Sequence, residues 1–364
     1  MHVSWFWIKQ RPQFLVEELS KKHKLTVVCL EDTYDAQKIQ NASTGLPFVL
    51  TTIFLFSKKL QGLFVSKVNF YLKKIQLRFL IRKTEVVWLN TPTQFLHIKT
   101  LLQPGHVLVY DCKDDMAAFH ESDPAVFQNI IAIEMSLCLK ADLILASSDV
   151  LKSRIKERYA VDANVFVVNN GLSDQLFEHQ QPAVLPGSLD FMLTDTTRVY
   201  VIYIGTISSW FDFDRVILAA SQNTRCTFVL IGPADIPIPV HPSIIHVPPV
   251  QHSFVNSIMQ FAHVLIMPFR ITELVKAVNP VKAYEYISSG KPVILSSYSE
   301  TAKFKDYAYL YTDDLSFSAL INSAANHSLL PKKSPDECLT FAKENTWTKR
   351  GLYIQQLLQA HNGE

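Results

Sequence analysis

The sequence lacks three features that would assign it to familiar functional classes. Its 35 Lys and Arg residues nearly balance 33 Asp and Glu residues, and a formal net charge of +2 excludes a strongly basic nucleic-acid binder. The five cysteines are scattered and form no Cys-x-x-Cys pair, which indicates a reducing compartment and no metal cluster. No run of 18 apolar residues occurs, and the first residues lack the pattern of a secretory signal, so neither a spanning helix nor a signal peptide is predicted.

What the chain does contain is enough apolar sequence for two cores. Its 364 residues are 48% hydrophobic, which suits two domains of ordinary size. Short apolar runs alternate with helical patterns in both halves, the order that predicts parallel sheets covered by helices. A stretch rich in Pro, Gly and polar residues marks a linker over 179–197. We therefore predict an α/β protein with domains over 1–178 and 198–343 and a final helix over 344–364.

The most informative stretch runs from Asn279 to Val293. Pro280 suits the first turn of a helix, and Gly290 with the following Lys-Pro pair ends it. A buried strand that ends before Arg270 precedes this helix. Helix N-termini attract anions, because their N–H groups lack partners inside the helix and the helix dipole is positive there.

The side chains around that helix N-terminus predict a nucleotide-diphosphate site. Lys276 and Lys282 flank it and would neutralise phosphates, while Glu285 in the first turn would bind the paired hydroxyls of a ribose. The predicted donor-binding residues of this region are Arg270, Lys276, Asn279, Lys282 and Glu285.

A second turn in the same half has a related pattern. An apolar strand over 199–204 is followed by Gly205 and Thr206 and then by a helix, a geometry that lets a phosphate approach the backbone, although one glycine is weak evidence. Trp210 and Asp212 lie in this turn and complete the predicted donor site. For Asp212 the alternative is a simple helix cap.

Three aspartates follow a buried strand in the first half. Asp111, Asp114 and Asp115 come at or after the end of the strand over 107–110, where open α/β sheets bind ligands. We predict Asp114 and Asp111 as catalytic candidates and Asp115 as an acceptor contact, with turn formation and capping as the alternative. Arg11, at the entrance of the first helix, is a further acceptor candidate or else a locally paired arginine. No His or Glu at ligand spacing accompanies the aspartates, so no metal is expected.

Residues 57–83 form a basic amphipathic segment, in which eight Lys and Arg residues alternate with apolar ones. Such segments often lie on anionic membrane surfaces, and the alternative is an ordinary surface helix. We expect a cytoplasmic protein with peripheral contact at the inner membrane face. The apolar start, Met1 to Ile8, is either a first strand or the loop after a strand that this chain lacks.

In order along the chain, these motifs resemble those of the B-fold (GT-B) glycosyltransferases, specifically the group-1, family 4-like enzymes of bacterial polysaccharide and teichuronic acid synthesis. The resemblance implies two Rossmann-like domains facing a cleft, with the donor mainly on the second domain, the acceptor mainly on the first, and the helix after Trp347 crossing back. The motifs that carry the resemblance are Gln10 to Gln13, Tyr110 to Asp115, Ala141 to Ser148, Asn169 to Gly171, Tyr203 to Thr206, Trp210 to Asp212, Met267 to Arg270, Asn279 to Tyr286 and Gly290 to Val293.

The resemblance also implies an activity. The chain would move a sugar from a nucleotide-diphosphate sugar to a glycan or lipid-linked acceptor, with Glu285 on the ribose, Lys282 and Arg270 on the diphosphate, and neither metal nor nucleic acid involved. The chain departs from the family pattern in three places. Ala277 stands where the family has a glutamate eight residues before Glu285, no arginine–lysine pair is evident near Gly205, and residues 5–11 replace a glycine-rich loop. The alternatives are a nucleotide-sugar epimerase of the same double fold and a non-catalytic sugar or nucleotide binder.

Overall fold

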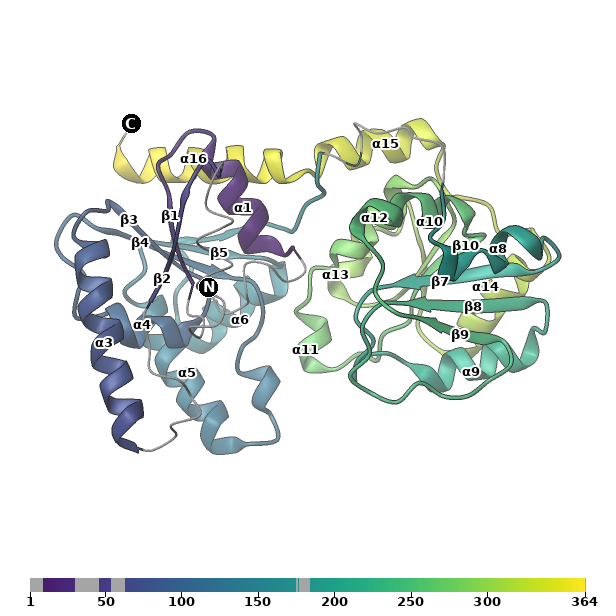
Figure 1. The fold of residues 1–364 in the computed structure, drawn as a ribbon, viewed down its shortest axis with the longest axis horizontal. Helices are drawn as coiled ribbons and strands as arrows, with labels where there is room; N and C mark the ends of the chain where they lie inside the picture. The colour runs from purple at the N-terminus through teal and green to yellow at the C-terminus, as the bar shows by residue number, and fades with distance from the viewer. Residues whose placement is uncertain (1–8, 30–45, 54–62, 175, 177–183, 364) are drawn as a thin grey trace. The chain divides into compact units, whose positions relative to one another are not determined.

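The computed structural model describes residues 9–29, 46–53, 63–174, 176 and 184–363 (Figure 1). The expectation for Met1 to Ile8 lies outside these residues. Contacts divide the chain into two compact units. Unit 1 comprises the chain up to Asn169 together with Arg350 onwards, and unit 2 runs from Asn170 to Lys349.

Unit 1 is built on parallel strands. Four of them pair in the order β3 (Val86–Leu89), β4 (Val107–Cys112), β5 (Leu143–Ala146) and β6 (Val165–Val167). The strands β1 (Thr26–Cys29) and β2 (Val49–Thr52) form a separate parallel pair. Strand β4 extends two residues beyond its predicted end, so Asp111 belongs to the strand and not to the loop.

Four helices of unit 1 begin where the sequence supplies proline or a capping side chain. Pro12 lies in the first turn of α1 (Arg11–Ser20), Pro92 and Pro124 open α4 (Pro92–Ile98) and α5 (Pro124–Cys138), and Ser148 caps α6 (Asp149–Tyr159). The segment predicted to be amphipathic forms α3 (Leu63–Ile81). No helix in the described part of the chain has both the length and the apolar run needed to cross a bilayer.

The last helix, α16 (Trp347–Asn362), starts in unit 2 and ends in unit 1, as predicted for the C-terminal helix. It packs against α1 through Gly351. A Cβ atom at this position would lie 2.9 Å from the Cβ of Glu18, so only glycine allows the two helices to approach this closely. Both helices lie along the same side of unit 1 (Figure 1).

Unit 2 contains one six-stranded parallel sheet in the order β12-β11-β10-β7-β8-β9. The four central strands, β11, β10, β7 and β8, are buried along their whole length, and the outer strands β9 and β12 are partly buried. Their bounds are β7 (Val199–Ile204), β8 (Cys226–Ile231), β9 (Ile244–Val247), β10 (Val264–Met267), β11 (Val293–Ser296) and β12 (Tyr309–Tyr311).

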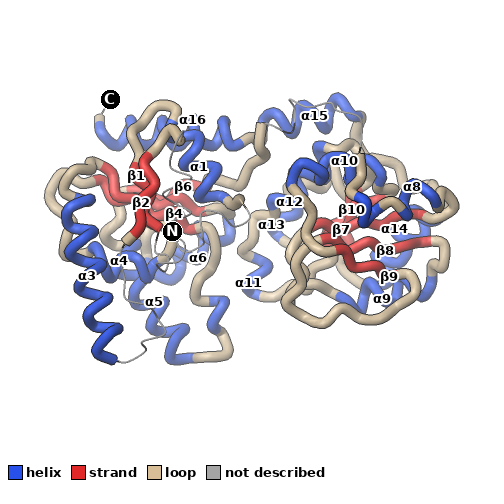
Figure 2. Tube along the Cα trace, in the orientation of Figure 1, coloured by secondary structure: helices blue, strands red, loops and turns tan. Residues whose placement is uncertain are grey.

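Helices cover both faces of this sheet (Figure 2). The helices α9 (Phe213–Gln222) and α14 (Asp314–Ala325) pack together on one face, and α10 (Val255–Phe261) and α12 (Val281–Ser288) lie on the other. The remaining helices of unit 2 are α8 (Phe191–Thr194), α11 (Glu273–Lys276), α13 (Ser299–Ala302) and α15 (Pro335–Glu344).

The strand order places a topological switch between β7 and β10. From β7 the chain passes through α9 to β8 on one side, and from β10 it passes through α12 to β11 on the other. In open α/β sheets, ligands bind at the carboxyl ends of the strands at such a point. The turn after β7 and the loop after β10, both singled out from sequence, meet there.

The expected domain boundaries at 178 and 344 differ from those of the two units. The residues that follow Asn169 and those that precede Arg350 belong to unit 2, because Asn170 hydrogen-bonds to Asn279 and Leu172 pairs with Thr346. The predicted linker over 179–197 also needs correction. Where it is described, Leu185, Leu189 and Met192 are buried in the core of unit 2, since this stretch packs against the sheet that follows.

Candidate functional site

The two loops at the switch point are joined backbone to backbone. Phe211 and Phe269 form an antiparallel bridge. Beside it the N–H of Asp212 donates to the carbonyl of Pro268 at 2.8 Å, and the N–H of Arg270 donates to the carbonyl of Trp210 at 2.8 Å. Residues from two distant parts of the sequence are thus held together, including three of the predicted donor residues.

Gly205 has a packing reason to be glycine. A Cβ atom on Gly205 would lie 2.8 Å from the hydroxyl of Tyr203. The neighbouring loop approaches even more closely, since a Cβ atom on Gly232 would lie 2.1 Å from the carbonyl oxygen of Gly205, and the φ of 142° at Gly232 also favours glycine. Thr206 is exposed, and its carbonyl accepts a hydrogen bond from the Tyr203 hydroxyl at 2.8 Å. The turn after β7 therefore has no room for a side chain at Gly205, and the buried hydroxyl of Tyr203 fixes it through Thr206.

Arg270 lies at this edge with its side chain 47% exposed. Its Nη2 is 2.6 Å from Oδ2 of Asp214, and its Nε is 3.6 Å from Oδ1 of Asp212. Asp212 also accepts the N–H of Arg215 at 3.3 Å as the cap of α9, so the cap role foreseen for it is confirmed.

Helix α12 is anchored to the end of β7. Tyr286 accepts the N–H of Ile204 at 2.7 Å through its hydroxyl, which lies 3.3 Å from the carbonyl oxygen of the same residue. The cap residue Pro280 provides no side-chain hydrogen bond to the helix N-terminus. Lys282 donates to Oε2 of Glu285 at 2.6 Å, and Glu285 is 7% exposed. The predicted ribose ligand and one predicted phosphate ligand are thus neighbours on one helix.

The other two predicted donor residues differ in their surroundings. Lys276 is 47% exposed and pairs with Glu273 at 2.6 Å. Asn279 is buried, and its Oδ1 accepts the N–H of Asn170 at 2.8 Å, while its Nδ2 donates to Tyr284 and Glu300 at 3.3 Å. A donor contact by the side chain of Asn279 was therefore the wrong prediction, because that side chain is used to join segments of unit 2.

In unit 1 the structure corrects the roles of Asp111 and Arg11. Asp111 is fully buried, accepts from Nε of Arg11 at 2.9 Å and from Nδ2 of Asn90 at 3.2 Å, and its Oδ1 lies 2.8 Å from Nη2 of Arg11. Arg11 is also buried and donates to the carbonyl of Val168 at 2.7 Å. The pair ties α1 to β4 and to the end of β6, so neither residue is placed to act as a catalyst or an acceptor contact.

Asp115 is likewise structural and not an acceptor contact. It is buried and lies 2.6 Å from Nη1 of Arg154 and 2.8 Å from Nη2 of Arg158, and it accepts the N–H of Ala118 at 3.2 Å. Burial alone would raise the pKa of Asp115, but the hydrogen bonds and charge of Arg158, together with Arg154, outweigh it and lower the pKa.

Asp114 is the aspartate of this group that remains accessible. Its side chain is 32% exposed and lies 3.8 Å from Nζ of Lys113. Partial burial raises the pKa of Asp114, and the charge of Lys113 opposes the shift. A raised pKa brings a carboxylate closer to the range in which it can take up a proton at neutral pH.

Two relevant residues were not singled out from sequence. Arg215, in the first turn of α9, lies 3.7 Å from Asp212 and 2.7 Å from Asp314, and adds a cation to the switch-point edge. The Asp-x-x-Arg spacing of residues 212–215 was a signal for it. Tyr286 had no such signal, because the sequence does not show which group the hydroxyl of a tyrosine on an apolar helix face will bond to. Within the described ranges, no group of three or more His, Cys, Asp or Glu side chains is placed to hold a metal ion.

Comparison with known proteins gives one curated relative and many similar structures. No family model matches the chain. It is 28% identical over 224 residues to the putative teichuronic acid biosynthesis glycosyltransferase TuaH of Bacillus subtilis (strain 168). The match covers 57% of this chain and 54% of that protein, so it spans about half the length of the relative.

The similar structures cover nearly the whole chain. HepE of Anabaena, in complex with UDP and glucose, superposes with a TM-score of 0.70 at 13% identity, covering 95% of both chains. Sucrose-phosphate synthase of Thermosynechococcus elongatus gives a TM-score of 0.69 at 14% identity, covering 96% of this chain and 92% of that one. WaaG, a glycosyltransferase involved in lipopolysaccharide biosynthesis, gives 0.61 at 12% identity, covering 94% of both. At such identities these likenesses show the fold, which is GT-B.

Proposed function

We propose, from the premise that this chain has the GT-B fold, that it is a glycosyltransferase of cell-surface polysaccharide synthesis. It moves a sugar from a nucleotide-diphosphate sugar to a glycan or lipid-linked acceptor. The partial similarity to TuaH supports the polysaccharide context. The UDP in the similar HepE structure supports a nucleotide donor.

The observation that carries the proposal is the construction of the switch-point edge in unit 2. The hydroxyl of Tyr286 holds α12 against the end of β7, and the antiparallel bridge holds Arg270 beside the turn after β7. Cations and a nearly buried carboxylate are thus placed at the edge where α/β sheets bind nucleotides. This construction supports the donor site predicted from the sequence, without Asn279.

In this site Arg270 and Lys282 bind the diphosphate, and Glu285 binds the ribose. Both cations are now paired with carboxylates, Arg270 with Asp214 and Lys282 with Glu285. Pairs exposed to solvent are worth about 0–1 kcal/mol, so exchanging Asp214 for a phosphate costs little. The negative charge on the leaving diphosphate grows during transfer, and fixed cations stabilise it most in the transition state. The reaction then needs no metal.

On the acceptor side, Asp114 accepts the proton of the attacking hydroxyl. It follows the end of β4 and is the accessible carboxylate of its loop, whereas Asp111 and Asp115 are buried in ion pairs. Its raised pKa suits a general base.

The exposed face of α3 fits an anionic membrane surface, which would bring a lipid-linked acceptor within reach at the inner, cytoplasmic face. Tyr71, Ile75 and Phe79 follow one another at every fourth position and are each more than half exposed. Lys67 and Arg78 are exposed on the same helix. Aromatic side chains and cations on one helix face are typical of interfacial helices. Sedimentation with vesicles containing anionic lipid tests this, and an Ile75→Ser, Phe79→Ser variant should lose most of the binding.

Calorimetric titration of the chain with UDP, ADP and GDP is the first test of the transferase proposal. We expect one of these nucleotides to bind at micromolar concentration. If none binds, the proposed function fails. Incubation of the matching nucleotide sugar with and without membrane extract then separates the rivals. A transferase releases nucleotide only with acceptor, an epimerase changes the sugar without one, and a non-catalytic binder does neither.

A further inference from the structure

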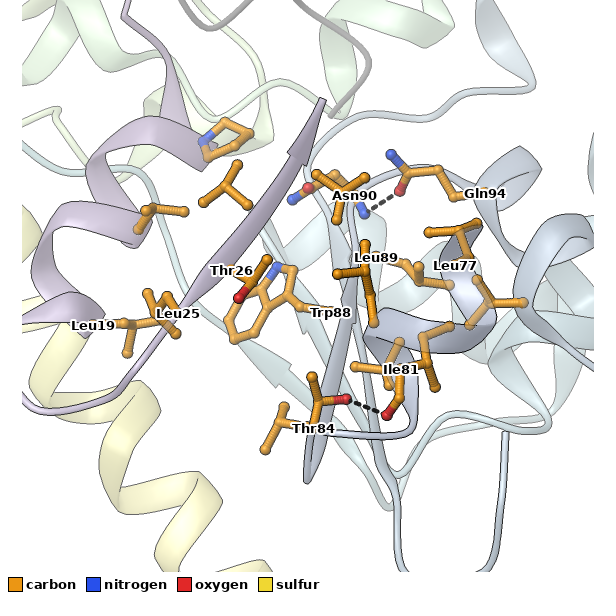
Figure 3. A pocket seen from close by; sticks show the side chains of 18 of the residues that line it. Leu19, Leu25, Thr26, Leu77, Ile81, Thr84, Trp88, Leu89, Asn90 and Gln94 are labelled. Carbon is orange, nitrogen blue, oxygen red and sulfur yellow. Dashed lines mark hydrogen bonds between the residues drawn. The ribbon is translucent and has the colours of Figure 1, made fainter. Parts of the chain in front are cut away.

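Unit 1 contains a cavity that the proposed transfer reaction does not use. It has a volume of about 230 Å³ and lies between α1, β1, α3, β3 and α4 (Figure 3). An apolar cavity of about 150 Å³ is already large enough to bind benzene. The space in unit 1 therefore has room for a small organic molecule or for part of a longer chain.

The wall of this cavity is apolar and uncharged. None of the described residues that line it is Asp, Glu, Lys or Arg. Leu19 and Leu25 lie on one side of the cavity, and Leu77 and Ile81 lie on the other (Figure 3). Trp88 of β3 lies between these two pairs, next to β1. Such a wall favours hydrocarbon and excludes phosphates and ionised groups, because a buried charge without a partner is costly.

Most polar side chains at the wall already have partners. The hydroxyl of Thr84 donates to the carbonyl of Ile81 at 2.9 Å (Figure 3). Oε1 of Gln94 accepts the N–H of Asn90 at 2.8 Å, and Nδ2 of Asn90 donates to Asp111. These groups are hydrogen-bonded within the fold and do not need a hydrogen bond from a ligand.

His97 of α4 is different. It lines the cavity, and its Nδ1 is buried with no hydrogen-bond partner among the described residues. Burial, and then the charge of Lys73, lower the pKa of His97, so the ring is neutral at neutral pH. Buried polar atoms in folded proteins nearly always have a hydrogen-bond partner. A hydroxyl on a ligand in the cavity can bond to the ring of His97 in either tautomer, because a hydroxyl both donates and accepts.

We propose that this cavity binds a single aliphatic chain that ends in a hydroxyl or a similar neutral polar group. The hydrocarbon lies along the leucine-rich wall, and the polar end bonds to His97. The site is separate from the proposed donor site and does not depend on transferase activity. Straight-chain fatty alcohols and branched isoprenoid alcohols share this chemistry, so the experiment compares both.

The test is calorimetric titration of the full chain with 1-hexanol, 1-octanol, 1-decanol and 1-dodecanol, and in a parallel series with geraniol and farnesol. Each added methylene should tighten binding about fourfold until the chain outgrows the cavity, after which the affinity stays level. Tighter binding of farnesol than of dodecanol would identify the isoprenoid source, and the reverse the fatty source. Affinity that rises without a plateau would indicate partition onto the surface and overturn the site.

Two variants locate the ligand. Leu77→Phe narrows the cavity and should weaken decanol binding at least tenfold, whereas Leu72→Phe, on the same helix but outside the lining, should leave it unchanged. His97→Leu should weaken decanol two- to tenfold but not 1-chlorodecane, which lacks the hydroxyl. Thermal melts check that the variants fold. Equal decanol affinity in wild type and Leu77→Phe would refute the proposal. The proposal would also be refuted if an extended apolar peptide bound and the alcohols did not, because the space would then be a groove in which a peptide strand pairs with the edge of β3.

Discussion

Replacing Glu285 by glutamine tests the donor site most directly. The substitution keeps the size of the side chain and removes its charge. In the structure Glu285 is 7% exposed and pairs with Lys282 at 2.6 Å across three residues of α12. If the carboxylate binds a ribose, two hydroxyls of the sugar donate to it, and the glutamine amide can accept only one of them well.

The structure sets two different magnitudes for this change. A hydrogen bond to a charged group is worth about 1.5–3 kcal/mol, so nucleotide binding should weaken about 10- to 150-fold. The loss in stability should be small, because an ion pair three residues apart on a helix is worth about 0.2–0.5 kcal/mol. A shift of at most about 2 °C in melting temperature is therefore expected. A large loss of affinity with a nearly unchanged melting temperature identifies a binding residue.

The assay is calorimetric titration of wild type and Glu285→Gln with the nucleotide that binds and with its 2′,3′-dideoxy analogue. Wild type should strongly prefer the natural nucleotide, and the variant should lose most of that preference. Glu18→Gln is the matched control, because Glu18 forms the same kind of pair with Lys21 at 2.6 Å across three residues at the end of α1, in unit 1 and outside the predicted donor site. If Glu285→Gln keeps the full preference for ribose hydroxyls, the assignment of Glu285 is refuted.

Four further predictions follow from the two units. Asp111→Asn leaves the buried Arg11 without its charged partner, so chemical denaturation should show a loss of about 3–5 kcal/mol in the free energy of unfolding. The pKa of Asp115 is lowered in the folded state, so the ionised carboxylate stabilises the fold fully above the unfolded pKa of about 3.9, and this stabilisation is lost as the pH falls through the folded pKa. Asp115→Asn should therefore flatten the acid side of a plot of unfolding free energy against pH. An unchanged plot would contradict this. Asp114→Asn should lower kcat by about 10²–10⁴ with nucleotide affinity unchanged in calorimetry, and a wild-type rate would exclude Asp114 as the base. Addition of EDTA should leave the initial rate of sugar transfer unchanged, whereas a loss that Mg²⁺ restores would show that the cations of the site do not suffice.

Local patterns in the sequence predicted most of the secondary structure. The bounds of β7 agree with the strand predicted over 199–204, and α12 begins directly after Pro280 and ends before Gly290, as its sequence pattern predicts. These predictions succeeded because hydrophobic periodicity, proline and capping residues act within a few residues of one another. The linker failed for the opposite reason. A composition rich in Pro and Gly marks irregular backbone, but it does not say whether Leu189 and Met192 reach a core.

The predicted site divides in the same way. The sequence predicts Glu285, Lys282 and Arg270 at one edge, because Arg270 follows the end of a strand and the other two lie in the first turns of a helix whose start is marked by Pro280. It could not separate Asp114 from Asp111 and Asp115, which look alike in sequence.

By itself, then, the sequence determined the α/β elements, their order and the edge of the sheet where polar residues gather, since these depend on local periodicity and on the ends of parallel strands. Only the tertiary structure decided which carboxylates are exposed and which are buried against arginines, because Arg11, Arg154 and Arg158 come from helices far along the chain. It also decided that the elements of unit 1 leave an apolar cavity between them. The volume left between packed elements depends on all of their side chains together, and no single segment of sequence contains it.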